Sequence, residues 1–486
     1  MLGHRRTNLI AAAAGLLSAL PAGAQDAGPQ QQARRDRIEQ LEEIRRDTRL
    51  RVNADIPPGQ RLFFDYGAYL QASYLSVDDS VGDGHVLRQY DFLPYARLNI
   101  DGVHEFFVRG RFGYQDYNDG DSFTGRGDEP IDGDLDRAYY RFDLRRYASA
   151  YGKSDPGKLT LQLGRDFVYW GNGLVLAQTL DGGMVTVGTD LLELTLLAGV
   201  TPTRTVDIDT SRPAFDYNTR RGFFGAMLTA DLGDHRPYVY VLSQRDFNSE
   251  DFRSVSFIDT RYNYNSVYLG AGSSGAIGPR IRYGVEAVAE FGTSKSNSFS
   301  IDGFGLFPVD QTSDRIHAYA VNARLDYFVE DPGQTRLSAE FTLATGDGDR
   351  GTTTNTFNGN QPDTDDTAFN AFGLINTGLA FAPSASNLMA LRLGAATLPL
   401  PETAATRRLQ IGTDVFFFAK HNRDAPIEEN TGDVRYLGWE PDVYLNWQAT
   451  SDITIALRYG IFFPNDDNFA FDDNRQFFYG GITFAL

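Results

Sequence analysis

The sequence has no cysteine, and only four of its 45 basic residues are lysines. The lack of cysteine excludes a disulfide framework and a thiolate metal site, and it suits a chain exported through an oxidising periplasm. The formal net charge of −19 argues against nucleic acid as a partner, because such a protein needs a basic face to displace counterions from phosphate. The excess of arginine over lysine suits planar oxyanions, which a guanidinium binds with two parallel hydrogen bonds, although codon usage explains it equally well.

Long apolar runs are also missing. The run Leu9–Leu20 follows Arg5 and Arg6 and precedes Ala22-Gly23-Ala24, which is the pattern of a signal peptide cleaved before Gln25. This run is too short for a spanning helix, which needs about 20 apolar residues. We therefore predict that residues 1–24 are a signal peptide and that the mature chain has no membrane-spanning helix.

Residues 25–58 are predicted to form an amphipathic periplasmic helix and a proline linker. The charge-rich stretch 31–52 carries Ile38, Leu41 and Ile44 at helical spacing. Its heptad pattern is poor, which favours a solvated helix over a coiled coil. Ile56-Pro57-Pro58-Gly59 then ends the helix.

Residues 59–486 alternate apolar and polar positions in segments of 9 to 17 residues, separated by alternating short turns and long polar loops. Leu437–Gln448 is the clearest segment, with one apolar face and one polar face. In lipid, only helices and closed sheets satisfy every backbone group. A soluble β-sandwich is the rival fold, but charged inner faces, long strands and aromatic strand ends disfavour it.

Nineteen such segments can be counted, whereas single-chain bacterial barrels have an even number of strands. Segment 371–381 breaks the alternation of short turns and long loops, so we assign it to a long external loop that begins at Asp347. The prediction is an all-β fold, a closed antiparallel transmembrane β-barrel of about 18 strands in the bacterial outer membrane, with sixteen strands as the alternative. The last strand ends at Leu486, where the barrel-assembly machinery usually meets an aromatic residue.

Three stretches resemble the alginate-export family of outer-membrane barrels. Leu437–Leu445, with the following hairpin strand that ends in Tyr459–Pro464, is similar to the penultimate hairpin of the family. Leu163-Gly164-Arg165-Asp166 with Leu180–Gly182 resembles its strand, inward loop and strand, although the family usually has glutamine at the position of Asp166. Ala344–Asp347 resembles the start of a large external loop.

This resemblance implies an eighteen-stranded monomeric pore with an arginine-rich constriction, through which an alginate-like polyuronate leaves the cell. The helix before the barrel is not a feature of that family. The alternative function is a general porin, or a porin for the uptake of small anions or sugars, in which Tyr139 and Tyr444 suit stacking on sugar rings.

Strand parity, with the more apolar face turned to lipid, predicts the side chains that line the pore. A polyanion in a low-dielectric tube needs compensating cations, and arginine forks bind carboxylates. The candidates are Arg97, Arg109, Arg111, Arg137, Arg141, Arg282, Arg324, Arg336, Arg392, Arg408 and Arg458, together with Glu440 and Asp442.

The same parity places as many acidic side chains inside as arginines, Glu286, Glu290 and Asp326 among them. The lumen is therefore an ion-pair network that either rigidifies the wall or orients its arginines. Strict alternation sends Arg165 towards lipid, where an arginine costs about 2–4 kcal/mol. A bulge near Gly164 or a position at the rim would remove that cost, and we do not expect Arg165 to line the constriction.

No catalytic constellation stands out, because the six histidines lack the spacing of a zinc motif or a neighbouring nucleophile motif. We expect neither an enzyme nor a cofactor. Asn118–Asp121 and Asp347–Asp349 could bind calcium, but both lack a bidentate glutamate and favour solvated turns. The expected partners are outer-membrane lipid and lipopolysaccharide, the assembly machinery, and an anionic polysaccharide or small anions.

Overall fold

The computed structural model describes residues 57, 59, 61–122, 127–248, 253–255, 258–302, 305–470 and 473–486. The predicted signal peptide and most of the predicted helix and linker lie outside these residues and stay predictions. Within the described residues, no helix is both long and apolar enough to cross a membrane.

Eighteen long strands form one antiparallel sheet that closes when the first strand pairs with the last, Tyr69 opposite Ala485. The predicted number of strands is confirmed, and segment 371–381 contains no strand. The strands are β1 (Leu62–Asp78), β2 (Gly84–Ile100), β3 (His104–Tyr117), β4 (Glu129–Asp143), β5 (Lys158–Trp170), β6 (Leu176–Gly188), β7 (Leu192–Val200), β8 (Arg221–Ala230), β9 (His235–Asp246), β12 (Tyr264–Ile277), β13 (Ile281–Lys295), β16 (Ser313–Phe328), β17 (Arg336–Ala344), β18 (Leu388–Thr397), β19 (Leu409–Lys420), β20 (Tyr436–Gln448), β21 (Ile453–Pro464) and β22 (Arg475–Ala485).

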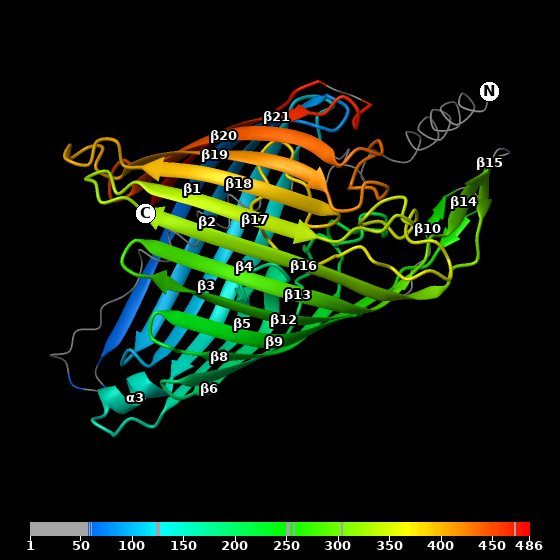
Figure 1. Cartoon of the computed structure of the whole chain (residues 1–486). Coiled ribbons are helices and arrows are strands. Elements are labelled where there is room, and N and C mark those ends of the chain that lie inside the picture. The colour runs from blue at the N-terminus through cyan, green and yellow to red at the C-terminus, as the bar shows by residue number, and fades with distance from the viewer. Residues whose placement is uncertain are drawn as a thin grey trace.

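The two ends of the barrel differ in the length of their loops. Short turns and helix α3 (Leu144–Ala150), which the carboxylate of Asp143 caps, lie at one end. The long loops and two small hairpins, β10 (Arg253–Val255) with β11 (Ile258–Thr260) and β14 (Phe299–Asp302) with β15 (Gly305–Pro308), lie at the other (Figure 1). This asymmetry is typical of outer-membrane barrels, whose long loops are extracellular.

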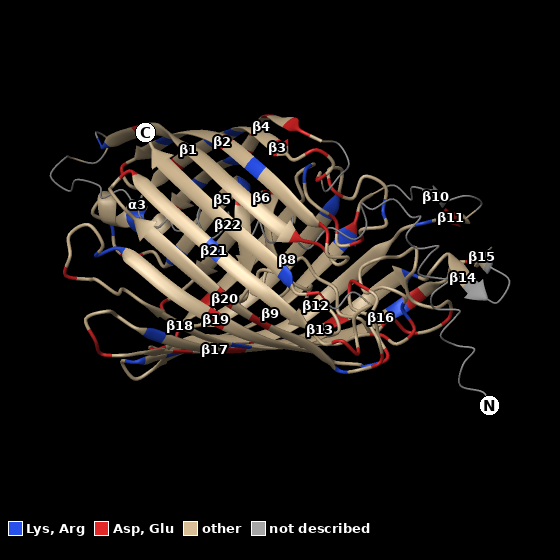
Figure 2. Ribbon diagram, turned by 90° about the horizontal axis from the view of Figure 1, so that it is seen from above, with Lys and Arg blue, Asp and Glu red and all other residues tan. Residues whose placement is uncertain are grey.

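Alternate side chains of each strand face lipid and lumen, as the period of two predicts. Along β16, Tyr319 and Leu325 are exposed on the outer face, while Ala318, Ala320 and Asn322 are buried inside. Many of the charged residues lie in the loops at the two ends of the tan strands (Figure 2). The outer face is therefore apolar where the hydrocarbon of the membrane requires it.

The loop of residues 345–387, here the β17–β18 loop, crosses the lumen. Its residues Phe369, Phe372 and Ile375 pack in one apolar cluster with inner side chains of β5–β9, β12, β13, β16 and β17. Leu379–Phe381 pack in a second cluster with inner side chains of β18–β22 and β1–β3. Because these two sets of strands form opposite arcs of the barrel, the loop fills much of the external half of the lumen.

Candidate functional site

The tip of the β5–β6 hairpin folds into the lumen beside this loop. Trp170, Leu174 and Leu176 are at most 1 % exposed, and Leu176 forms a parallel bridge with Phe372 of the β17–β18 loop. Glycines make the turn possible, since Gly171 has φ +60° and a Cβ there would lie 2.2 Å from the carboxylate of Glu286.

The carboxylates of three fully buried glutamates accept hydrogen bonds from backbone N–H groups of these inward segments and so hold the segments in place. Glu286 of β13 accepts from the N–H of Asn172 at 2.7 Å and from the hydroxyls of Tyr238 and Tyr240. Glu290, four residues further along β13 on the same face, accepts from the N–H of Asn370 at 3.0 Å. Carboxylate acceptors make strong hydrogen bonds, so they fix the position of segments that have no sheet of their own.

Glu440 of β20 holds the far side of the β17–β18 loop in the same way. Its carboxylate accepts from the N–H groups of Leu379 at 2.5 Å, Ala380 at 2.7 Å and Phe381 at 2.9 Å. The ring of Phe381 stacks on Phe462 with centroids 4.1 Å apart. One carboxylate thus satisfies three consecutive backbone donors that would otherwise be buried without acceptors.

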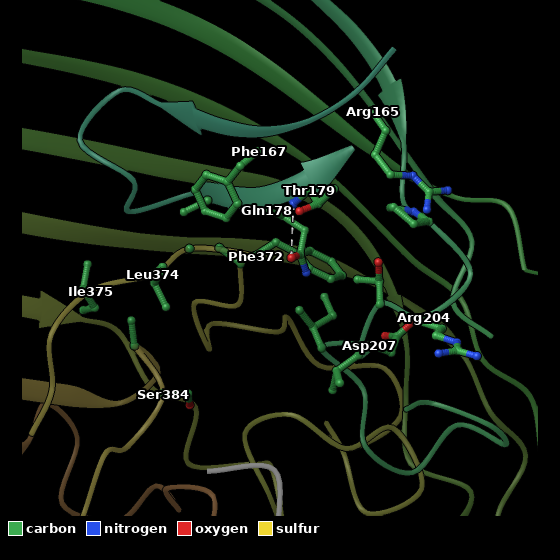
Figure 3. Close-up of a pocket in the computed structure, with 18 of the residues that line it drawn as sticks. Arg165, Phe167, Gln178, Thr179, Arg204, Asp207, Phe372, Leu374, Ile375 and Ser384 are labelled. Atoms are coloured by element: carbon green, nitrogen blue, oxygen red, sulfur yellow. Dashed lines mark hydrogen bonds between the residues drawn. The ribbon is translucent and has the colours of Figure 1, made fainter. Parts of the chain in front are cut away.

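A cavity of about 260 Å³ remains between these inward segments and the wall of β3–β6. Its other sides are the β7–β8 loop (residues 201–220) and residues 370–375 and 384–386 of the β17–β18 loop. In Figure 3, Arg165 and Arg204 lie at one side of the cavity, and Leu374 and Ile375 lie at the other. The charged side chains that line it are Arg111, Arg137, Arg165, Arg204, Asp134, Asp136 and Asp207.

Ion pairs connect neighbouring strands around this part of the wall, from β2 to β6. Each strand contributes a charge to a partner on the next, which keeps the arginines extended between neighbouring strands. The pairs are Arg111 with Asp91 at 2.6 Å, Arg109 with Asp136 at 2.6 Å, Arg137 with Asp166 at 3.4 Å and Arg165 with Asp181 at 2.6 Å.

The β7–β8 loop is fixed by a buried network of two arginines and two aspartates. Arg221, the first residue of β8, donates to Asp207 at 2.6 Å and lies 3.6 Å from Asp246. Arg212 pairs with Asp246 and lies 3.7 Å from Asp207. Burial raises the pKa of Asp207, but Arg221 and Arg212 outweigh it, and the pKa lies below its ordinary value. The carboxylate therefore stays charged at neutral pH.

The predicted pore-lining residues are spread over the whole barrel, and two of them, Arg111 and Arg137, line the cavity. The other candidates lie elsewhere on the described strands and turns, and the candidates as a whole differ in their burial. Buried are Arg97, Arg109, Arg137, Arg392, Arg458, Glu440 and Asp442; half-buried are Arg111, Arg141, Arg324 and Arg336; exposed are Arg282, near the start of β13, and Arg408, in the turn before β19.

Several of these side chains have partners that fix them against the wall. Arg141 donates to Gln162 at 2.7 Å, and Arg458 donates to the carbonyl oxygen of Leu457 at 3.0 Å. Arg408 donates to Gln448 at 2.8 Å. The inner surface is thus a mixed network of charges and polar groups.

Arg392→Met is expected to destabilise the barrel by about 3–5 kcal/mol, because it leaves the buried carboxylate of Asp414 and the half-buried carboxylate of Glu340 without their cation. The guanidinium of Arg392 lies 2.9 Å from Glu340 and 2.9 Å from Asp414. Urea unfolding in detergent, followed by heat-modifiable gel mobility, measures the loss. Arg280→Met is the matched control, since the pair of Arg280 and Glu330 is exposed and such pairs contribute about 0–1 kcal/mol. Equal losses in the two variants would contradict this account.

Arg165 and Arg204 line the cavity although parity did not select them. The expectation that Arg165 stays away from the constriction assumed regular alternation along β5. Instead, β5 leaves the wall just beyond Arg165. The pair of Arg165 with Ala138 of β4 is the last one in the register of these two strands. Arg204 lies in a loop, where no periodicity applies. In the sequence, the signal for this break in regular alternation was the glycine next to Arg165. In the structure Gly164 has φ +123°.

Comparison with known proteins agrees with this architecture. A family model described as "Alginate export" matches residues 82–469. Among solved structures, OccK11 (OpdR) and OpdK of Pseudomonas aeruginosa superpose with TM-scores of 0.51 and 0.52 at 13% and 10% sequence identity. Each alignment covers 87% of this chain, with 96% of OccK11 and 98% of OpdK. At these identities the likeness concerns the fold alone. No curated protein matches the chain in sequence.

Proposed function

The chain belongs to the alginate-export family of outer-membrane β-barrels, and on that premise we propose that an anionic, uronate-type polysaccharide leaves the cell through the cavity between β3–β6 and the inward loops. The observation that carries the proposal is the lining of this cavity. It joins Arg111, Arg137, Arg165 and Arg204 to apolar side chains such as Phe167.

This combination suits the chemistry of a uronate residue. A uronate carries a planar carboxylate, which an arginine fork can bind, and a pyranose ring with an apolar face, which an aromatic side chain can cover. The aspartates between the arginines keep each guanidinium oriented, so that a passing carboxylate meets a succession of moderate sites. Conduction needs such weak, repeated binding, because a single tight site would trap the polymer.

Ion selectivity of the refolded barrel in a planar bilayer tests the proposal. We expect a preference for anions, and block of the current by oligouronates at lower concentrations than by inorganic phosphate. Cation preference, or no block by oligouronates, would contradict the proposal. The barrel would then be a general porin.

Arg111→Gln and Arg165→Gln are expected to weaken the block by oligouronates. A hydrogen bond to a charged group contributes about 1.5–3 kcal/mol, which corresponds to a roughly ten- to hundredfold higher blocking concentration for each arginine. Arg408→Gln is the control, because Arg408 is exposed in a turn far along the chain from the cavity strands. If all three variants lose block to the same degree, long-range charge rather than the cavity governs binding.

A further inference from the structure

The wall of the barrel is split between β4 and β5. The register of these strands runs from Asp143 opposite Thr160 to Ala138 opposite Arg165 and ends there. Beyond this point β5 still pairs with β6 as far as Trp170, and β4 still pairs with β3. The pairing of β6 with β7 also ends at this level, at Asp181. The inward hairpin has therefore left both of its neighbours in the wall.

This split reaches into the part of the wall that faces lipid. Leu135 of β4 and Phe112 of β3 point outward and are 42% and 50% exposed. On β2 and β3, the outward pair Phe92 and Phe112 is followed towards the external end by Tyr90 and Tyr114, residues typical of an interfacial girdle. A strand edge at the depth of Leu135 is costly in hydrocarbon, because its backbone groups need partners.

Arg165 bridges the split. Its guanidinium donates two hydrogen bonds to the carboxylate of Asp181 on β6, at 2.6 and 2.7 Å, and a third to the carbonyl oxygen of Leu135 on β4 at 2.6 Å. It also lies 3.6 Å from Asp134. The arginine whose parity points towards lipid thus closes the wall where strand pairing is missing.

Gly164 brings Arg165 to this place. A Cβ at Gly164 would lie 2.1 Å from the carbonyl oxygen of Ala138, and its φ of +123° is open only to glycine at low cost. The backbones of the two strands are therefore in close contact at Gly164, next to the last paired position below the split.

The cavity in the lumen extends to this split. Its lining includes Arg111 and Arg137, which face inward, and also Leu135, whose side chain is on the outer face. The cavity is amphipathic, with Arg165 and Arg204 opposite the apolar residues of the inward loop. An amphiphilic molecule at this opening could place its charged head group in the cavity and its apolar tail in the surrounding lipid.

We propose that the β4–β5 split is a lateral doorway, closed by the Arg165 clasp, through which an anionic single-chain amphiphile passes between the lumen and the outer leaflet. No sheet hydrogen bonds join β4 to β5 above Ala138 in the described strands. Opening therefore requires the breaking of side-chain contacts across the split, those of Arg165 with Leu135 and Asp134 and the ion pair of Arg137 with Asp166. This function goes beyond axial passage of a polysaccharide and does not depend on it.

The chain has no cysteine, so the doorway can be closed chemically in Leu135→Cys/Asp181→Cys. In the reduced form of this variant Arg165 has lost the two hydrogen bonds to Asp181 that orient its guanidinium, which weakens the clasp. A bifunctional methanethiosulfonate reagent then ties β4 to β6. The probe is octyl β-D-glucuronide, compared with free glucuronate, as a blocker of the current in a planar bilayer.

We expect octyl glucuronide to block the reduced variant at an about tenfold lower concentration than glucuronate, because its tail stays in lipid. Cross-linking should abolish this advantage and leave block by glucuronate unchanged. Asp143→Cys/Thr160→Cys, which joins the same strands where they are paired, is the matched control and should keep the advantage. If the advantage survives cross-linking of β4 to β6, the tail binds inside the lumen and the doorway is wrong. If cross-linking also removes block by glucuronate, the split belongs to the axial path, which equally overturns the doorway and leaves the proposed function intact.

Discussion

Glu440→Ala is expected to raise the single-channel conductance several-fold, by releasing the β17–β18 loop from the far wall of the lumen. The substitution leaves the N–H groups of Leu379, Ala380 and Phe381 without their acceptor. Each buried donor without a partner costs about 1–3 kcal/mol. The ring contacts of Phe381 favour the bound position of the segment, but they do not satisfy these donors. The segment therefore lowers its free energy by moving into water, where the three N–H groups find acceptors.

The conductance of reconstituted single channels measures this change, and heat-modifiable gel mobility shows whether the barrel itself is still folded. Glu440→Gln is expected to have an intermediate effect. Its amide oxygen can still accept hydrogen bonds from the backbone N–H groups, but its NH2 group is a donor and faces a backbone donor. Glu330→Ala, in an exposed turn, is the control and should conduct like the unchanged protein. A folded Glu440→Ala barrel with unchanged conductance would show that the loop is held by its apolar contacts alone.

The barrel itself could be predicted from the sequence because each strand carries its own period of two. A strand with one face in lipid and one in a polar lumen needs this alternation along its whole length, and eighteen strands repeat the signal. Segment 371–381 is apolar and resembles a strand, yet the rule that long and short loops alternate excluded it. The structure explains its composition, since Phe372 and Ile375 pack against the inner wall.

The constriction could not be predicted in the same way, because it is built by segments that leave the sheet. Parity predicts that Glu286 and Glu440 point inward, but it cannot tell that their partners are backbone N–H groups of loops 114 and about 60 residues away in the chain. Arg165 shows the same limit, since the register of β5 with β4 ends at this residue and its side chain bridges the split beyond it. In the sequence only the neighbouring glycine, Gly164, marks the place.

Arg221→Met is the change with the second large expected effect, a loss of about 3–5 kcal/mol of stability and release of the β7–β8 loop. The guanidinium is fully buried between Asp207 and Asp246, and removing one partner of a buried ion network leaves the others uncompensated. Trypsin should then cut the loop in the folded barrel. Arg220→Met is the matched control, because Arg220 is the exposed neighbour and its removal leaves the network intact.

The loss of stability in Arg221→Met should depend on pH in a defined direction. In the unchanged protein the pKa of Asp207 is lowered, despite the effect of burial, by Arg221 and Arg212. A lowered pKa contributes stability that is present above the ordinary aspartate pKa of about 3.9 and is lost as the pH falls through the lowered value. Without Arg221 the carboxylate gains by becoming protonated. The difference in unfolding free energy between the two proteins should therefore be largest at pH 7 and shrink below about pH 4. A difference that stays constant over this range would mean that Arg221 acts through packing rather than through its charge.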